Sequence, residues 1–358
     1  MNARTDNPLN GRDNYLTPIR LTLAAVVAVW HAFAVTGAER FHEPAIAGLS
    51  PSYMAVNGFF ILSGFLIASS LERRRALIPF GVSRLLRLYP ALIALVVTGA
   101  ILTLFIGGDG ATGSWLYPLK SLVFMDSSGS YPGLFSDHPR IAWSIPLWTL
   151  RYEVIAYLIA PALFFLGLRG IRGAALIFAF FTVGFIVVQL CNCSPHAAIV
   201  QMFRLVAAFS LGGLIFALRD HIGFSFTRLA GALVLCALAW NTPAFEAAAN
   251  LVLAWLLFRL GYAQGGSQAL KKIPDWSYGL YIWHWPVFQL VWMAQPGIAP
   301  LAILALGMPV SLVISALSWR YIERPALNHK KTVSDWLTAR VSPVFNGARA
   351  LIFARSGV

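Results

Sequence analysis

Residues 17–37 read TPIRLTLAAVVAVWHAFAVTG, and this stretch decides the fold class. A helix that spans a bilayer needs about 20 mostly apolar residues in a row, and the stretch has that length. Its ionisable side chains are Arg20, near the start, and His31, further in. The sequence therefore predicts a membrane-spanning α-helix here.

Stretches of this kind recur along the whole chain, whose 358 residues are 58% hydrophobic and only 11% charged. A soluble chain carries about 25% charged residues. We predict an all-α, polytopic membrane protein with about ten spans, at residues 17–37, 52–71, 86–106, 147–167, 172–190, 200–218, 228–242, 245–262, 277–294 and 299–320. Residues 1–16 form an N-terminal segment, 17–325 the transmembrane domain and 326–358 a basic tail. Residues 107–146, rich in Gly, Pro, Ser and Tyr, are expected to form a structured external loop.

The basic residues give the orientation of the spans. With ten spans, all but five of the 27 lysines and arginines lie on the side of the two termini. Positive charge accumulates on the cytoplasmic side, so both termini are predicted to be cytoplasmic. The exceptions are Arg40, Lys120, Arg140, Arg151 and Arg204. The net charge of +13 therefore reflects the membrane flanks, and nucleic acid is not an expected partner.

Arg20 and His31 are expected to share one face of their helix. Eleven residues at 100° each make three turns and about 20°, and they separate the two side chains by about 16 Å along the axis. A cation at the entrance and a base in the interior would suit a phosphate-bearing ligand whose arm reaches inward. The plainer interpretation is a snorkelling arginine and a hydrogen-bonded core histidine.

Each of the other ionisable residues in the spans is expected to have a structural or functional role, because a charge there costs at least about 2–3 kcal/mol. Arg84 and Arg87 share a helix face and form either a phosphate site or a simple membrane anchor. Glu153 is expected to pair with a residue on another helix, with Arg204 one candidate, or to act on a substrate. Ser63 and Gly64 suit close helix packing.

Near the C-terminus, His284 falls well inside the ninth span. Arg320 and Glu323 are expected to pair at i, i+3 and to end the helix before Pro325. The three cysteines show no metal-ligand spacing, and no metal site is predicted.

Together these motifs resemble one family, the acyltransferase-3 family of integral-membrane acyltransferases. The matches occur in the family's order over residues 17–325: Arg20-x10-His31, Phe60–Leu66 with Ser63-Gly64-Phe65, Arg84-x-x-Arg87 with Tyr89-Pro90, Leu147-Trp148-Thr149-Leu150 with Glu153, Ser277-Tyr278-Gly279-Leu280-Tyr281 with His284-Trp285-Pro286, and Glu323-Arg324-Pro325.

The resemblance implies a bacterial inner-membrane enzyme that moves an acyl group, usually acetyl, from acetyl-CoA to a carbohydrate hydroxyl. It implies a catalytic role for His31, an essential Arg20, and a cytoplasmic donor site at Arg84 and Arg87. We expect Glu153 to orient His31 or bind the sugar, and we assign substrate binding to Trp148, Arg151, Tyr281 and His284. Direct transfer and an acyl-enzyme at His31 both stay open.

The expected partners are a carbohydrate or glycolipid acceptor and membrane lipid, with acetyl-CoA as co-substrate and no bound cofactor. The tail is expected to contact the lipid surface and to have no chemical role, and nothing predicts an oligomeric state. The alternative from another class is a glycan transporter or flippase, since buried charges in ten spans also suit a substrate path. Transporters usually show inverted repeats, and no such halves are found here.

Overall fold

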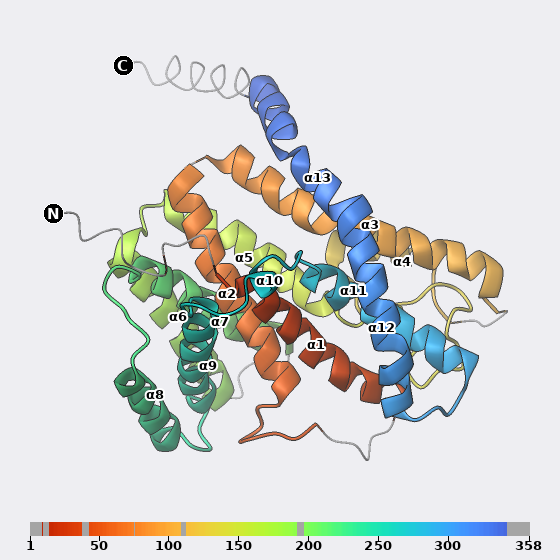
Figure 1. The fold of residues 1–358 in the computed structure, drawn as a ribbon, viewed down its shortest axis with the longest axis horizontal. Helices are drawn as coiled ribbons and strands as arrows, with labels where there is room; N and C mark the ends of the chain where they lie inside the picture. The colour runs from red at the N-terminus through yellow and green to blue at the C-terminus, as the bar shows by residue number, and fades with distance from the viewer. Residues whose placement is uncertain are drawn as a thin grey trace.

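The computed structural model describes residues 9, 14–37, 43–74, 76–108, 112–191 and 197–341, and these form helices with no strand (Figure 1). The predicted all-α class is confirmed. The helices in chain order are α1 (Leu16–Val35), α2 (Pro51–Arg74), α3 (Leu77–Ile106), α4 (Tyr117–Phe124), α5 (Leu147–Phe165), α6 (Gly170–Cys191), α7 (Ala197–Ala217), α8 (Phe226–Leu238), α9 (Phe245–Gly261), α10 (Gln268–Lys271), α11 (Ser277–Ala294), α12 (Pro300–Ser318), η2 (Trp319–Glu323) and α13 (Arg324–Asn328).

A helix lies at each of the ten predicted spans. Seven of them are long and apolar enough to cross a membrane: α1, α2, α3, α5, α6, α7 and the segment that begins with α12. The others are α8 with 13 residues, α9 with 17, and α11, which carries several buried polar and aromatic side chains. The chain is a multi-pass membrane protein, and the count of ten crossings stays a prediction.

The closest helix contact joins α2 to α7 and confirms the small-residue packing predicted at Gly64. A Cβ atom on Gly64 would collide with the carbonyl oxygen of Phe209, and one on Gly212 would collide with that of Ile61. Without side chains at these two positions the helix backbones come together. This contact places the middle of α2 in the centre of the bundle.

The segment at residues 112–146 is folded, as predicted for the long loop. It contains α4, and it buries Tyr131 and Trp143, whose rings lie 5.8 Å apart edge to face. The Trp285 indole N–H on α11 donates to the Ala142 carbonyl at 3.0 Å. Side chain and backbone together fix the loop onto one end of the bundle, which we call the loop end.

The C-terminal helix does not end before Pro325, so that prediction is wrong. A π-helical turn at Trp319–Glu323 leads directly into α13, and the helical segment runs from Pro300 to Val341. The wider π turn lets the chain pass a proline that cannot donate an N–H. The blue helix leaves the bundle in Figure 1. Residues 342–358 and most of residues 1–13 lie outside the described part of the chain.

The predicted pair of Arg320 and Glu323 is also wrong. Glu323 is fully buried and accepts a hydrogen bond from Ser318 at 3.1 Å, while Arg320 lies beside the Tyr321 ring. The i, i+3 geometry holds for an α-helix, whereas these residues occupy a π turn that rotates them onto different faces.

Candidate active site

A cavity of about 620 Å³ lies among α1, α2, α3, α5 and α11. Five cationic side chains from four separate segments line it: Arg20, Arg73, Arg84, Arg87 and Lys330. The structure therefore brings together Arg20, Arg84 and Arg87, which the sequence motifs linked. A cluster of this kind is suited to a ligand with several negative charges.

Asp275 holds two of these arginines in place. One oxygen of its carboxylate accepts from Arg20 at 2.7 Å and from Arg87 at 2.6 Å, and the other accepts from the Ser277 hydroxyl at 2.5 Å. Burial opposes the charged form, but Arg20 and Arg87 outweigh it and lower the pKa of Asp275 to about 2. The carboxylate is therefore charged at neutral pH. We call this end of the bundle the Asp275 end.

Arg84 is placed differently from its two neighbours. Within the described ranges it makes no ion pair, and its guanidinium lies 5.9 Å from the Phe80 ring centre and 5.8 Å from that of Tyr157. Arg87, in contrast, also approaches Glu323 at 3.6 Å. Arg84 is thus the arginine of the trio whose charge is not already balanced by a carboxylate.

A hydrogen bond between α5 and α11 lies at the inner end of the cavity, toward the loop end. The Thr149 hydroxyl and the Tyr281 hydroxyl lie 2.7 Å apart, and both residues line the cavity. Glu153, one turn further along α5, also lines it and accepts a hydrogen bond from Tyr157 on its own helix. The expectation that Glu153 pairs with another helix is therefore wrong.

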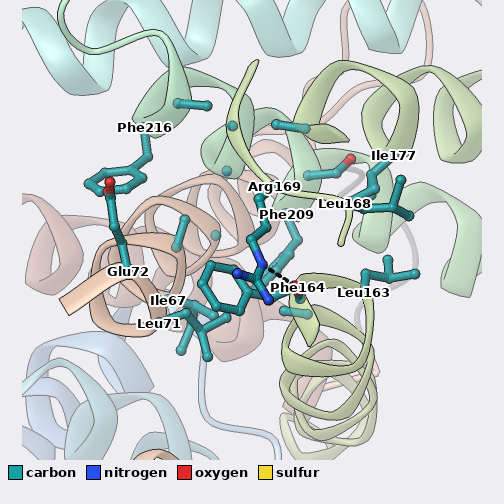
Figure 2. Close-up of a pocket in the computed structure, with 18 of the residues that line it drawn as sticks. Ile67, Leu71, Glu72, Leu163, Phe164, Leu168, Arg169, Ile177, Phe209 and Phe216 are labelled. Carbon is teal, nitrogen blue, oxygen red and sulfur yellow. Dashed lines mark hydrogen bonds between the residues drawn. The ribbon is translucent and has the colours of Figure 1, made fainter. Parts of the chain in front are cut away.

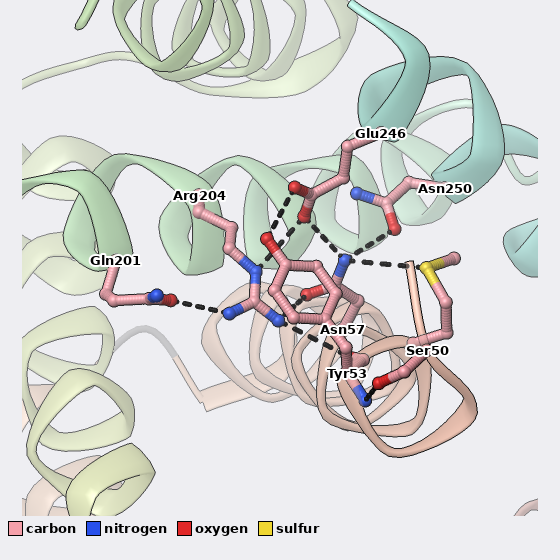
Figure 3. Close-up of polar contacts among 8 residues, drawn as sticks. Ser50, Tyr53, Asn57, Gln201, Arg204, Glu246 and Asn250 are labelled. Carbon is pink, nitrogen blue, oxygen red and sulfur yellow. Dashed lines mark hydrogen bonds and ion pairs between the residues drawn. The ribbon is translucent and has the colours of Figure 1, made fainter. Parts of the chain in front are cut away.

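Arg204, the proposed partner of Glu153, is buried in a separate polar network near the loop end (Figure 3). It pairs with Glu246 of α9 at 3.1 Å and donates to Asn57 of α2 at 2.9 Å. Asn57 also donates to Glu246 at 2.8 Å, and the Tyr53 hydroxyl donates to the same carboxylate at 2.7 Å. The first turns of α2 and α9 reach Arg204 because α2 packs tightly on α7. The network ties three helices together.

His31 and His284 form a direct contact between α1 and α11. His31 Nδ1 lies 2.7 Å from His284 Nε2, and His284 Nδ1 lies 2.7 Å from the Leu280 carbonyl oxygen. A carbonyl can only accept, so His284 Nδ1 carries a proton. A second proton on His284 would charge a fully buried ring. His284 Nε2 therefore accepts from His31 Nδ1, and the lone pair of His31 is left on Nε2.

The histidine pair lies beyond the inner end of the cavity. His31 is not among the described residues that line the cavity, but Tyr281 is, and its ring centre lies 6.4 Å from that of His284. The rise of α1 puts His31 about 16 Å from Arg20 along the helix axis. The cations and the histidine base thus lie on opposite sides of Tyr281 and Thr149.

Two predicted substrate-binding residues, Trp148 and Arg151, lie away from this cavity, near the loop end of α5. Trp148 packs against the Tyr152 ring at 6.0 Å. Arg151 donates weakly to the Met125 carbonyl at 3.5 Å, and its buried Nε has no hydrogen-bond partner among the described residues. The structure brings Tyr281 and His284 to the site, but not these two.

The sequence motifs missed Asp275, Arg73 and Lys330. Asp275 lies two residues before α11, where an acidic residue is also an ordinary helix-start signal. Arg73 and Lys330 fall in basic clusters that match a membrane flank just as well. Leu327 and Lys330 line the cavity because the helix continues past Pro325.

Comparison with known proteins gives the family. The family described as "Acyltransferase domain", acyltransferase 3, matches residues 13–320, and the chain belongs to this family. It is 27% identical over 309 residues to Nodulation protein 10 of Rhizobium leguminosarum bv. viciae, covering 75% of this chain and 80% of that protein. It is 25% identical over 341 residues to an O-acetyl transferase of Shigella phage Sf6, covering 87% and 96%. No solved structure matches significantly.

Proposed function

We propose that this protein transfers an acyl group, in the simplest case acetyl, from acyl-CoA to a hydroxyl of a cell-surface or exported carbohydrate. The observation that carries the proposal is that Tyr281 lines the arginine-lined cavity and also lies against His284 of the His31–His284 pair. Family membership supports acyl transfer, and the name of the phage relative supports an oxygen acceptor. The protein acts in the bacterial inner membrane, with the Asp275 end in the cytoplasm.

Coenzyme A suits the cavity because it carries several phosphate charges and ends in a long, flexible thioester arm. Arg84 binds a phosphate without first giving up an ion pair, whereas Arg20 and Arg87 are held in place by Asp275. Arg73 and Lys330 add charge to the same wall. The arm then passes Thr149 and Tyr281 to bring the thioester to His31.

His31 acts as the general base in this proposal. Its Nε2 takes the proton of the acceptor hydroxyl while that oxygen bonds to the thioester carbon. The carbon–sulfur bond then breaks, and the proton on His31 passes to the departing thiolate, so coenzyme A leaves as the thiol. His284 fixes the tautomer and orientation of His31.

The acceptor arrives from the loop end. Arg151 has a buried Nε with no hydrogen-bond partner in the described segments, and Trp148 lies next to it on α5. A planar aromatic ring and a guanidinium are groups that hold a sugar by stacking and hydrogen bonds. Glu153 does not orient His31 in this proposal, since His284 already occupies His31 Nδ1 and Glu153 lies on the donor side of Thr149.

The test is turnover of labelled acetyl-CoA by the purified full chain with lipid-linked or free glycans. We expect label in the glycan with the wild type and none with His31→Ala, while Trp30→Phe, its neighbour on α1, keeps activity. Each variant is first shown to elute as the wild type does on size exclusion. Full transfer by His31→Ala would exclude this mechanism. Uptake of glycan into vesicles without any loss of acetyl from coenzyme A would favour the transporter alternative.

A further inference from the structure

The arginine-lined cavity, or donor cavity, extends along α2 from an inner end to an outer mouth. Phe59 lies at the inner end, where its ring centre is 5.6 Å from that of Tyr281. Ser63 and Arg73 line the cavity further along the same helix. Arg73 follows Phe59 by about four helical turns, or about 21 Å along the axis. Arg73, in the last turn of α2, therefore marks the mouth of the donor cavity.

Lys330 lines the outer part of the same cavity from the C-terminal helical segment. Glu323, in the π turn of that segment, approaches Arg87 at 3.6 Å. Lys330 comes about two helical turns after Glu323, so it lies about 10 Å further along the segment. Leu327 and Lys330 both line the cavity, whereas the exposed Lys331 does not. The segment thus turns one of two adjacent lysines toward the donor cavity.

The two cations at the mouth are not paired with carboxylates. In the part of the chain that the structure describes, neither Arg73 nor Lys330 makes an ion pair. Arg73 donates to the Ser69 carbonyl on its own helix at 3.2 Å. Glu72, its neighbour in the sequence, lines a second cavity instead (Figure 2). There it contacts Arg219 at 3.2 Å. Both cations at the mouth can therefore bind an anionic group of a ligand without first breaking an ion pair.

We propose that Arg73 and Lys330 form a second phosphate subsite, which binds the phosphate on the ribose of coenzyme A. This inference rests on the proposed function, because it takes acyl-CoA as the donor. The thioester arm runs inward from the diphosphate, which lies at Arg84, beside the two arginines that Asp275 holds. The ribose is joined to the other end of the diphosphate, so its phosphate lies toward the mouth. Cations at the mouth suit that group.

This subsite selects the form in which the acyl group is supplied. A phosphopantetheine arm on a carrier protein has no ribose, so it brings no phosphate to Arg73 and Lys330. Dephospho-coenzyme A keeps the diphosphate, the ribose and the adenine but lacks the ribose phosphate. Neither donor can form the charge-assisted hydrogen bonds that the ribose phosphate forms with a lysine and an arginine. The protein is therefore expected to use free acyl-CoA in preference to both.

The test compares the binding of coenzyme A and dephospho-coenzyme A to the purified full chain in detergent, by isothermal titration calorimetry at low ionic strength. We expect the wild type to bind coenzyme A at least about tenfold more tightly, the factor that one charge-assisted hydrogen bond gives. Equal affinity for the two ligands would overturn the subsite but not the proposed donor. Binding of neither ligand would overturn the proposed donor as well.

Variants of the two adjacent lysines locate the subsite. Lys330→Gln should lower the affinity for coenzyme A about fivefold, as for an exposed charge pair, and leave the affinity for dephospho-coenzyme A unchanged. Lys331→Gln is the matched control and should keep both affinities, since Lys331 does not line the cavity. An unchanged ratio of the two affinities in Lys330→Gln, whether both fall or neither does, would refute the assignment of Lys330.

Two further variants separate the outer phosphate from the inner ones. Arg84→Gln should weaken the binding of both ligands by the same factor, because both carry the diphosphate. The double variant Arg73→Gln/Lys330→Gln should bring the two affinities close together. A double variant that still prefers coenzyme A tenfold would show that the ribose phosphate binds elsewhere.

Discussion

At the scale of single residues, one carbonyl oxygen sets the chemistry of the histidine pair. Leu280 accepts from His284, and this fixes which nitrogen of His31 can act as a base. The sequence singled out both histidines but assigned His284 to substrate binding. It could not predict their contact, because that contact joins residues 253 positions apart on two helices. Helical spacing shows which residues share a face but not which face another helix meets.

His284→Phe should therefore lower kcat by about 10²-fold or more, the usual contribution of a positioned general base, and leave KM for acetyl-CoA nearly unchanged. The phenyl ring keeps the bulk but cannot accept from His31. His284→Gln, whose amide oxygen can accept, should recover part of the rate. Steady-state kinetics on folded protein measures both. A tenfold rise in KM with unchanged kcat would contradict a positioning role.

Asp275 is a second residue whose role the sequence motifs could not predict. The motifs predicted that Arg20, Arg84 and Arg87 share a donor site, and in the structure all three line one cavity. They gave no sign of the carboxylate between Arg20 and Arg87, since an acidic residue before a helix has a common local role.

The pH dependence of stability tests this carboxylate. The folded-state pKa of Asp275, about 2, lies below the ordinary value, so its stabilisation is complete above about pH 4 and is lost as pH falls through about 2. The difference in thermal midpoint between wild type and Asp275→Asn should stay constant from pH 8 down to about 5. It should shrink below about pH 4. A difference that changes steadily between pH 8 and 6 would speak against this account.

At the scale of helices, contact between α2 and α7 depends on two glycines. The sequence predicted close packing at Gly64 from its small neighbours, and the structure confirms it. It could not distinguish Gly212 from Gly213, which are adjacent on α7. Only Gly212 faces the backbone of α2, whereas a Cβ on Gly213 would meet open space.

Gly212→Ala should therefore lower the free energy of unfolding by roughly 1–3 kcal/mol through overpacking. Gly213→Ala should be neutral or slightly stabilising, because alanine favours a helix by about 1 kcal/mol over glycine. Thermal unfolding in one detergent compares the two. Equal losses in both variants would mean that the helix contact is not the cause.

The Arg204 network is the other inter-helix tie. Arg204→Met leaves Glu246 buried without its cation and should cost about 3–5 kcal/mol. Adding Glu246→Gln removes the stranded charge and should recover part of the loss. If the double variant unfolds more easily than Arg204→Met alone, groups other than Arg204 stabilise the Glu246 carboxylate.

At the scale of the whole molecule, composition alone predicted the class, because a chain with so few charges cannot cover itself in water. The family resemblance, carried by motifs spread over the spans, is confirmed by the match to residues 13–320. The end of the last span was predicted wrongly, because Pro325 is an ordinary helix stop and a π turn has no distinct sequence pattern.

Orientation is tested with single cysteines in a cysteine-free background. The exposed Ser128 lies in the loop and Lys331 in the C-terminal helix. An impermeant thiol reagent should label Ser128→Cys in intact spheroplasts and Lys331→Cys only after permeabilisation. Labelling of both in intact spheroplasts would mean that an even number of spans separates the two residues, whereas the ten-span prediction puts seven between them.

The helical segment from Pro300 to Val341, which includes the π turn and a turn at His329, is 42 residues long, or roughly 60 Å from end to end. Leu327 and Lys330 belong to it and also form part of the cavity wall. A rotation of the residues in the cavity wall would therefore also move the residues that follow them in the segment. A fluorescent reporter joined directly behind Val341 would therefore move with the wall of the donor cavity, and its anisotropy would register the entry of a polyanion into that cavity.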